Sequence, residues 1–187
     1  KVASGKKLVT LNHDEWVSGA VWSADESKIL TWSEDKTARI WSARGVGEPR
    51  VLHEGHAINS ATWSSDGTRV TTVAADGVVR EWAMDGSDKP ISSFHLAVEN
   101  ATIVVFSGRG DRFATASQDR IIRIWDARNK AELVAFRGHE DKIKSLSWSP
   151  DDKRVVSTSK DKTVRLWNAD GSGEPVVLRG HKHWVYN

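Results

Sequence analysis

Residues 148–167 read WSPDDKRVVSTSKDKTVRLW and contain the pattern that decides the fold. Three further blocks of the same length resemble this one: WSADESKILTWSEDKTARIW at 22–41, WSSDGTRVTTVAADGVVREW at 63–82 and FSGRGDRFATASQDRIIRIW at 106–125. The Trp that ends each block recurs at positions 41, 82, 125 and 167, in steps of 41, 43 and 42 residues. Two other columns move by the same steps: an initial aromatic residue (Trp22, Trp63, Phe106 and Trp148) and an inner aspartate (Asp35, Asp76, Asp119 and Asp161). Columns that move together indicate a repeat of fixed internal length.

The blocks are predicted to form β-strands. Runs such as 69–73 and 163–167 are rich in β-branched and aromatic residues, and turn residues at 65–67, 75–77 and 150–152 separate them. Two further strands are expected between blocks, as at 143–148 and 176–178. Four short strands in about 42 residues, repeated, predict an all-β fold of propeller blades, each made of four antiparallel strands.

The repeats resemble those of the WD-repeat (tryptophan–aspartate repeat) family over nearly the whole chain. The family's Gly-His element is represented by Gly138-His139, Gly180-His181, Gly55-His56 and the variant Asn12-His13, and its closing Trp-Asp by Trp125-Asp126. Two repeats depart from the pattern. His56 lies two residues closer to its following aromatic residue than His13 and His139 do, and Leu96-Ala97 occupies the Gly-His position of the third repeat.

The resemblance implies that 1–187 is a WD-repeat propeller, or part of one. It would have four complete repeats, at 12–52, 53–94, 95–136 and 137–178, plus a terminal strand from each neighbouring blade. Residues 6–11 match 131–136, so we expect 1–11 to be the last strand of a preceding blade and 179–187 to begin a fifth repeat. Family rings usually have more blades, and an open arc exposes sheet edges and apolar faces. We therefore expect a longer parent chain, which the start at Lys1 also suggests, or self-association to close the ring.

A hydroxyl stands four residues before each column aspartate, and a histidine lies upstream in three repeats. The resemblance implies structural tetrads, in which hydrogen bonds link Asp, His, Ser or Thr, and the indole N–H. The residues are His13, Thr31, Asp35 and Trp41; His56, Thr72, Asp76 and Trp82; Thr115, Asp119 and Trp125; and His139, Ser157, Asp161 and Trp167. Such chains satisfy buried polar groups that would otherwise cost about 1–3 kcal/mol each. The third tetrad is expected to be incomplete because it has no histidine.

These residue types could also be taken for a Ser-His-Asp triad. A nucleophile is normally used once, whereas this set recurs in three repeats, so we predict no enzyme and no catalytic residue. The hydrolase alternative would be excluded if Thr31, Thr72 and Ser157 were buried and bonded to indole N–H groups. The segment 181–183 (His-Lys-His) has no neighbouring carboxylate or cysteine in the pattern, so neither a metal site nor a cofactor is expected.

The loops entering each first strand and the turns between second and third strands are expected to share one face. The resemblance implies that partners dock there, and the positions expected to point outward include Trp16, Glu34, Asn59, Asn100, Gln118, Lys142, Lys144, Lys160, Trp184 and Tyr186. Trp16 and Trp184 are the strongest candidates because Trp is enriched at interface hot spots. Trp32, which replaces small residues in its column, is expected to pack between blades. The predicted function is a non-catalytic scaffold that binds a protein or peptide.

Charge and composition limit the other classes of partner. The chain has 27 Lys and Arg against 25 Asp and Glu, a net charge of +2, so no strong field attracts nucleic acid or acidic lipid. Nucleic acid is therefore not the expected partner, although the basic fourth repeat makes nucleic-acid binding the alternative function. No apolar run approaches the ~18 residues of a membrane span, and no membrane contact is expected. A chain without cysteine fits a reducing compartment, and we expect a cytoplasmic location.

The turn segments also bear on the origin of the repeats. Asp-Gly-Ser-Gly-Glu-Pro at 170–175 is echoed by Gly-Val-Gly-Glu-Pro at 45–49. This wording resembles the repeats of large bacterial multidomain regulators, so the repeats are expected to be of bacterial type.

Overall fold

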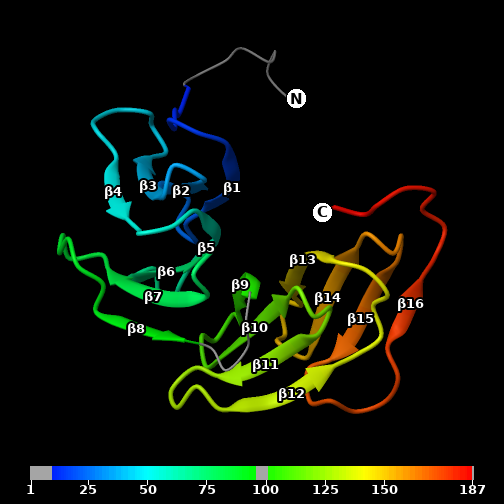
Figure 1. Ribbon diagram of the computed structural model, residues 1–187. Helices are drawn as coiled ribbons and strands as arrows, with labels where there is room; N and C mark the ends of the chain where they lie inside the picture. Colours follow the sequence, from blue (N-terminus) through cyan, green and yellow to red (C-terminus); the bar gives the residue numbers. More distant parts are fainter. Residues whose placement is uncertain (1–9, 96–100, 187) are drawn as a thin grey trace, which may run out of the picture.

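The computed structural model describes residues 10–95 and 101–186. These residues form sixteen β-strands, and no helix long and apolar enough to cross a membrane occurs among them. The strands make four antiparallel sheets arranged as the blades of a β-propeller (Figure 1), so the predicted fold class is confirmed.

Each blade is a meander of four consecutive strands. Blade 1 contains β1 (Val17–Trp22), β2 (Lys28–Ser33), β3 (Thr37–Ser42) and β4 (Arg50–His53). Blade 2 contains β5 (Ile58–Trp63), β6 (Arg69–Ala74), β7 (Val78–Ala83) and β8 (Ser92–His95). Blade 3 contains β9 (Ala101–Phe106), β10 (Arg112–Ser117), β11 (Ile122–Asp126) and β12 (Glu132–Phe136). Blade 4 contains β13 (Ile143–Trp148), β14 (Arg154–Ser159), β15 (Val164–Asn168) and β16 (Val176–Leu178).

The turns between second and third strands show why the blocks have a fixed length. Gly77 has a φ of 76° between β6 and β7, and Lys36, Arg120 and Lys162 adopt φ values of 66° to 69° at the equivalent positions. The preceding aspartate stabilises this tight turn, since its carboxylate accepts a backbone N–H two residues later, as in Val78 N to Asp76 Oδ1 at 3.0 Å. An insertion here would shift the hairpin register, which fixes the spacing between the hydroxyl and the closing Trp.

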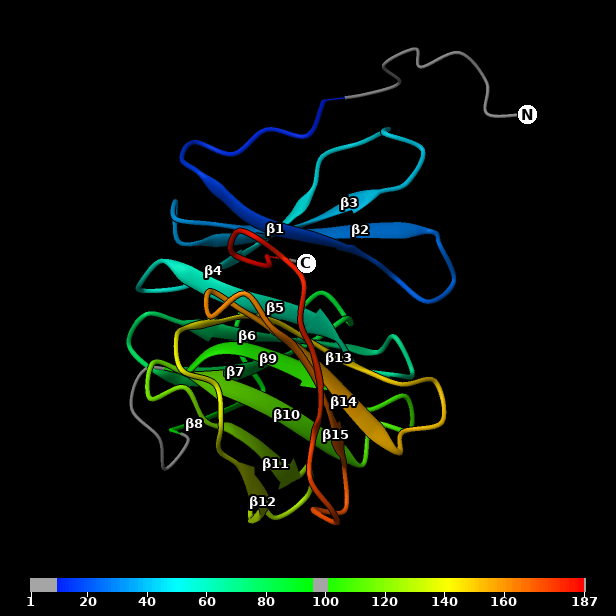
Figure 2. The same cartoon turned by 90° about the vertical axis from the view of Figure 1, so that its right-hand side faces the viewer.

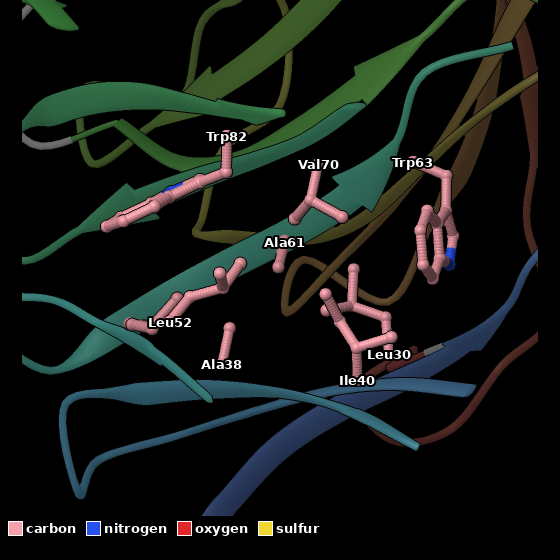
Figure 3. Packing of buried hydrophobic residues seen from close by; sticks show 9 residues of the cluster. Leu30, Ala38, Ile40, Leu52, Ala61, Trp63, Val70 and Trp82 are labelled. Atoms are coloured by element: carbon pink, nitrogen blue, oxygen red, sulfur yellow. The ribbon is translucent and has the colours of Figure 1, made fainter. Parts of the chain in front are cut away.

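The hydrophobic core lies between the blades. Leu30 and Ile40 of blade 1 lie on the side of Trp63 of blade 2, and Leu52 lies on the side of Trp82 (Figure 3). Equivalent clusters join blade 2 to blade 3 and blade 3 to blade 4, and Figure 2 shows the sheets of blades 1, 2 and 3 one below the other. Each blade thus offers its β-branched and aliphatic face to the first strand of the next blade, as alternation along the strands requires.

Polar groups also join neighbouring blades. The carboxylate of Asp152 in blade 4 accepts the backbone N–H groups of Gly108 and Arg109 in blade 3 at 2.6 and 3.0 Å. The indole Nε1 of Trp148 donates to Val105 O across the same boundary at 3.1 Å. Because these bonds satisfy polar atoms at the rims of the apolar clusters, they fix how one blade sits on the next.

The first and last blades have faces without such a neighbour. Val17 of β1 is 49% exposed, whereas its equivalent Ile58 of β5 is 1% exposed. At the other end, Val185 is buried although it follows the last strand, and its N–H donates to Ser159 O at 3.1 Å. The segment after β16, red in Figure 2, therefore starts to cover blade 4 in the way that a following first strand would. The predicted strand at 1–11 falls mostly on residues 1–9, outside the described residues.

Candidate interaction surface

Blade 4 contains a complete hydrogen-bond chain beneath its entry loop. The indole Nε1 of Trp167 donates to Ser157 Oγ at 2.9 Å, and Ser157 Oγ lies 2.7 Å from His139 Nε2. His139 Nδ1 lies 2.6 Å from Asp161 Oδ2. The chain is consistent with one proton assignment, in which Ser157 donates to Nε2 and His139 donates from Nδ1. The loop that begins blade 4 is thereby tied to β14 and to the β14–β15 turn.

Blade 1 repeats this arrangement. Trp41 Nε1 donates to Thr31 Oγ1 at 2.8 Å, and His13 bridges Thr31 and Asp35 at 2.7 and 2.8 Å. Arg39 adds an ion pair to Asp35 at 3.2 Å. The predicted members of these two tetrads thus lie together in the structure.

Blade 2 differs from its prediction. His56 is not the histidine of a tetrad: its side chain is 60% exposed, and only its Nδ1 approaches Asp76, at 3.3 Å. Glu54 takes the buried position instead and accepts a hydrogen bond from Thr72 Oγ1, which in turn accepts the indole N–H of Trp82 at 2.9 Å. The physical reason is distance along the chain, because Glu54 precedes its hydroxyl by 18 residues, as His13 and His139 do.

An arginine compensates the buried carboxylate of blade 2. Arg80 Nη1 lies 2.7 Å from Glu54 Oε2, and Arg80 Nη2 donates to Asp76 Oδ2 at 2.9 Å. Glu54, Arg80 and Asp76 therefore form an ion network where blades 1 and 4 have a histidine and an aspartate.

Blade 3 has the lower part of the chain. Trp125 Nε1 donates to Thr115 Oγ1 at 2.9 Å, and Asp119 pairs with Arg123 at 2.8 Å. The predicted absence of a histidine at Leu96-Ala97 lies outside the described residues.

The environments shift the pKa values of these groups in opposite directions. Burial raises the pKa of Asp161, but hydrogen bonds from Thr163 and His139 lower it by more. The pKa of Asp161 therefore lies well below its usual range. The pKa of Asp35 is lowered in the same way: burial raises it, and hydrogen bonds from Thr37 and His13 lower it by more. Burial lowers the pKa of His139, which keeps the ring neutral, whereas burial raises the pKa of Glu54 despite Thr72 and Arg80.

The hydroxyls of these chains are not placed for nucleophilic chemistry. Thr31, Thr72 and Ser157 are all buried, and each accepts an indole N–H. An oxygen held in this way cannot approach a substrate in solvent, so the hydrolase alternative is excluded for these three residues. Among the described residues no group of three His, Asp or Glu side chains could hold a metal ion.

The residues predicted to face a partner divide into two groups. Trp16 is 79% exposed beside Glu34, whose N–H donates to Trp16 O at 3.0 Å. Asn59 and Gln118 are exposed on blades 2 and 3, and Asn100 lies outside the described residues. Trp32, by contrast, packs against the core between blades 1 and 2 and over Gly19, as expected of an inter-blade residue.

The second group gathers around blade 4. Lys160 Nζ lies 3.9 Å from the ring centroid of Trp184, and Lys144 Nζ lies 5.4 Å from that of Tyr186. The two rings are half exposed, with centroids 6.2 Å apart. Lys142 is exposed beside Lys160, whose N–H donates to Lys142 O at 2.9 Å. Four residues from distant parts of the sequence thus form one basic and aromatic cluster.

Comparison with known sequences identifies the repeats. The family model described as "WD domain, G-beta repeat" matches residues 5–42, 47–83, 88–126 and 130–168. The chain belongs to the WD-repeat family. Each matched range starts before a first strand and ends at or just after the closing Trp, so the WD repeats are offset from the structural blades by about one strand.

Three relatives of this WD-repeat chain are eukaryotic proteins whose names refer to different processes. It is 29% identical over 152 residues to human "WD repeat and HMG-box DNA-binding protein 1", covering 81% of this chain and 13% of the relative. It is 29% identical over 146 residues to "Ribosome biogenesis protein WDR12 homolog" of Ixodes scapularis, covering 76% and 34%. It is 45% identical over 47 residues to mouse "Coronin-7", covering 25% and 5%. The chain thus spans about a third or less of each of these proteins, and the expected bacterial type of the repeats stays a prediction.

Two features of these WD repeats escaped the sequence analysis. Glu54 could have been found by counting 18 residues back from Thr72, because the same interval gives His13 and His139. A fourth column of arginines, Arg39, Arg80, Arg123 and Arg165, moves in step with the other three. Three of these arginines pair with the column aspartate, so the column signals an ion pair at the hairpins of blades 1, 2 and 3.

Proposed function

We propose that this chain is a non-catalytic scaffold that binds a protein or peptide on the face carrying the blade entry loops. The observation that carries the proposal is the exposure of Trp16 and Trp184 on that face, above loops that buried hydrogen-bond chains hold in place. Exposed Trp side chains on a rigid support are typical interface anchors, because little conformational entropy is lost when they bind.

The relatives support a general binding role. Their names concern a DNA-binding protein with an HMG box, ribosome biogenesis and a coronin, yet all three share WD-repeat sequence with this chain. A shared region in proteins of such different names is best explained by docking, with chemistry supplied elsewhere. A cytoplasmic location is part of the proposal and agrees with the absence of cysteine.

Alanine variants of the two tryptophans test the docking face. Partner capture from cells that express the chain should fall for Trp16→Ala and Trp184→Ala, while the melting temperature stays unchanged. Leu133→Ala is the matched control, because Leu133 is a half-exposed apolar residue on the outer strand β12. Equal losses for all three variants would contradict a docking role for the entry-loop face.

We also propose that the uncovered blade faces are closed by further blades of a parent protein or by a second copy. Val17, Ala20 and Trp22 of β1 are exposed, whereas the equivalent Ile58, Ala61 and Trp63 are buried. The isolated chain should therefore self-associate in light scattering. A mass of 20.7 kDa across micromolar concentrations, with a cooperative melt, would show that four blades are stable alone.

A further inference from the structure

We propose that the docking face includes a basic and aromatic seat for an acidic peptide segment of the partner. The seat consists of Lys144, Lys160, Lys162, Lys182, Trp184 and Tyr186. Its occupant carries Asp or Glu residues on both sides of one apolar side chain. This inference rests on the proposed scaffold function and names the chemistry of the partner.

The segment that carries the two rings of the seat is bound to blade 4 through its backbone. Val185, between them in sequence, is 7% exposed, and its N–H donates to Ser159 O. The carbonyl of Tyr186 accepts a hydrogen bond from Thr158 Oγ1 at 3.2 Å. Because alternate residues of an extended segment point to opposite sides, burial of Val185 directs Trp184 and Tyr186 outward. The backbone that carries the two rings is thus anchored on blade 4.

The surface between the rings and the lysines is hollowed. A depression of about 440 Å³ is lined by Lys162, Lys182, His183, Trp184 and Tyr186. Its lining contains three basic or titratable nitrogen groups, two aromatic rings and no carboxylate. A volume of this size accommodates an apolar side chain with its flanking backbone.

The positive charge on the lysines of the seat is available for a partner. Among the described residues, none of the four lies within 4.0 Å of a carboxylate oxygen, whereas Lys130 on blade 3 pairs with Glu81 at 3.3 Å. The nearest aspartate in sequence, Asp161, already accepts hydrogen bonds from His139 and Thr163. Positive charge left unpaired at a surface attracts acidic partners and orients them.

The fold does not require this charge. Lys160 stands where blades 1, 2 and 3 have Glu34, Ala75 and Gln118, and Lys144 stands where blade 1 has Ser18. Lys182 occupies the position of Asp14 in blade 1. At three of the four lysine positions blade 1 has a residue of opposite or no charge, whereas Lys162 corresponds to Lys36, so the excess of positive charge is a local property of blade 4 and the segment after β16.

The geometry favours carboxylates over nucleic-acid bases. Single-stranded nucleic acid binds by stacking bases on open aromatic faces. Here lysine ammonium groups already lie over Trp184 and Tyr186, at 3.9 and 5.4 Å. A base would have to displace them, whereas a carboxylate can pair with the same ammonium groups while an apolar side chain enters the depression.

A labelled peptide tests the seat directly. The probe is a fluorescein-labelled peptide of about twelve residues with Asp and Glu on both sides of a central Phe, measured by anisotropy against the whole 187-residue chain. Binding is expected at low salt and should weaken as salt is raised. Lys160→Glu combined with Lys162→Glu should weaken it about tenfold or more, and Trp184→Ala about tenfold.

The controls separate this inference from the scaffold proposal. Lys36→Glu changes the blade 1 counterpart of Lys162, and it should leave both affinity and melting temperature unchanged. Equal loss for Lys36→Glu, failure of the acidic peptide to bind, or tighter binding of a random single-stranded oligonucleotide would each overturn the inference. If the peptide fails while Trp16→Ala still reduces partner capture, the scaffold function stands and only the acidic seat is wrong.

Discussion

Blades 2 and 4 hold the same hydroxyl–indole pair with acceptors of different electrostatic kind. In blade 4 the neutral ring of His139 accepts from Ser157 and donates to Asp161. In blade 2 the carboxylate of Glu54 accepts from Thr72, and the Arg80 guanidinium separates it from Asp76. The two blades show that this position needs a hydrogen-bond acceptor directed at the strand rather than a particular residue.

The choice of acceptor changes the neighbouring residues. With histidine, the aspartate keeps a free oxygen that takes the hydroxyl of Thr163 at 2.6 Å. With glutamate, the equivalent residue is Val78, and the aspartate takes the arginine instead. The neutral acceptors of blades 1 and 4 are therefore accompanied by a threonine hydroxyl on the aspartate, with Arg39 added in blade 1. The charged acceptor of blade 2 requires a cation, because a buried unpaired carboxylate is strongly unfavourable.

Removal of Arg80 should have the largest effect. Arg80→Met is expected to lower the free energy of unfolding by about 3 kcal/mol at neutral pH, because Glu54 and Asp76 then face each other without a cation. Arg39→Met, the counterpart in blade 1, should cost about 1 kcal/mol, since the histidine there needs no cation, Asp14 is exposed, and Asp35 keeps its hydrogen bonds from His13 and Thr37. Urea unfolding curves measure both. Similar losses for the two variants would mean that the networks of blades 1 and 2 do not differ electrostatically.

The Gly-His histidines of blades 2 and 4 should differ as well. His139→Ala should cost about 2 kcal/mol, because Ser157 and Asp161 lose a buried partner. His56→Ala should change stability by about 0.5 kcal/mol or less, because that side chain is mostly exposed. Equal shifts of the denaturation midpoint would contradict the assignment of Glu54 as the buried acceptor.

The fold followed from the sequence because its determinants recur. Hairpin register, closing Trp and turn aspartate are each repeated four times, so noise at one position, such as Phe106 in place of Trp, does not hide the period. The tetrad of blade 2 was mispredicted for a related reason. Gly55-His56 matches the family's Gly-His motif. Which residue bonds the Thr72 hydroxyl depends, however, on the interval along the chain to Thr72, and that interval indicates Glu54.

The interaction surface could be predicted only in part. The outward positions were expected from the resemblance to the WD-repeat family, and Trp16 and Trp184 are exposed in the structure. Which of them meet depends on how the segment after β16 returns to blade 4, and no local pattern encodes that path. The cluster of Lys160 with Trp184 is therefore visible in three dimensions, whereas its members are 24 residues apart in the chain.

Loss of a single supporting hydroxyl should have a smaller effect. Thr163→Val is expected to cost about 1 kcal/mol, since Asp161 loses one of its hydrogen bonds but keeps the Thr163 N–H and His139. The pKa of Asp161 should rise toward its usual value, which NMR titration of the carboxyl measures. Val78→Thr in blade 2 is the reverse control. It should add little to the free energy of unfolding, because Asp76 is already paired with Arg80. A cost for Thr163→Val close to zero would show that the hydroxyl is not part of the network.

Replacing Glu54 by histidine should change total stability little at neutral pH but should change its pH dependence. Burial raises the pKa of Glu54 above its usual 4.5, so the folded chain binds this proton more readily than the unfolded chain does. The contribution of this carboxyl therefore falls as pH rises from 4.5 through the raised pKa. In Glu54→His the new ring would resemble His139, whose pKa burial lowers below 6.5. The contribution of the new ring to stability is therefore complete above pH 6.5 and is lost as pH falls through the lowered pKa.

The unfolding free energy of the variant should lie within about 1 kcal/mol of the parent near neutral pH. Relative to the parent it should rise between about pH 5 and pH 8. Guanidinium unfolding at these two pH values measures the difference. A difference that does not depend on pH would mean that the charge at position 54 is not what distinguishes blade 2 from blade 4.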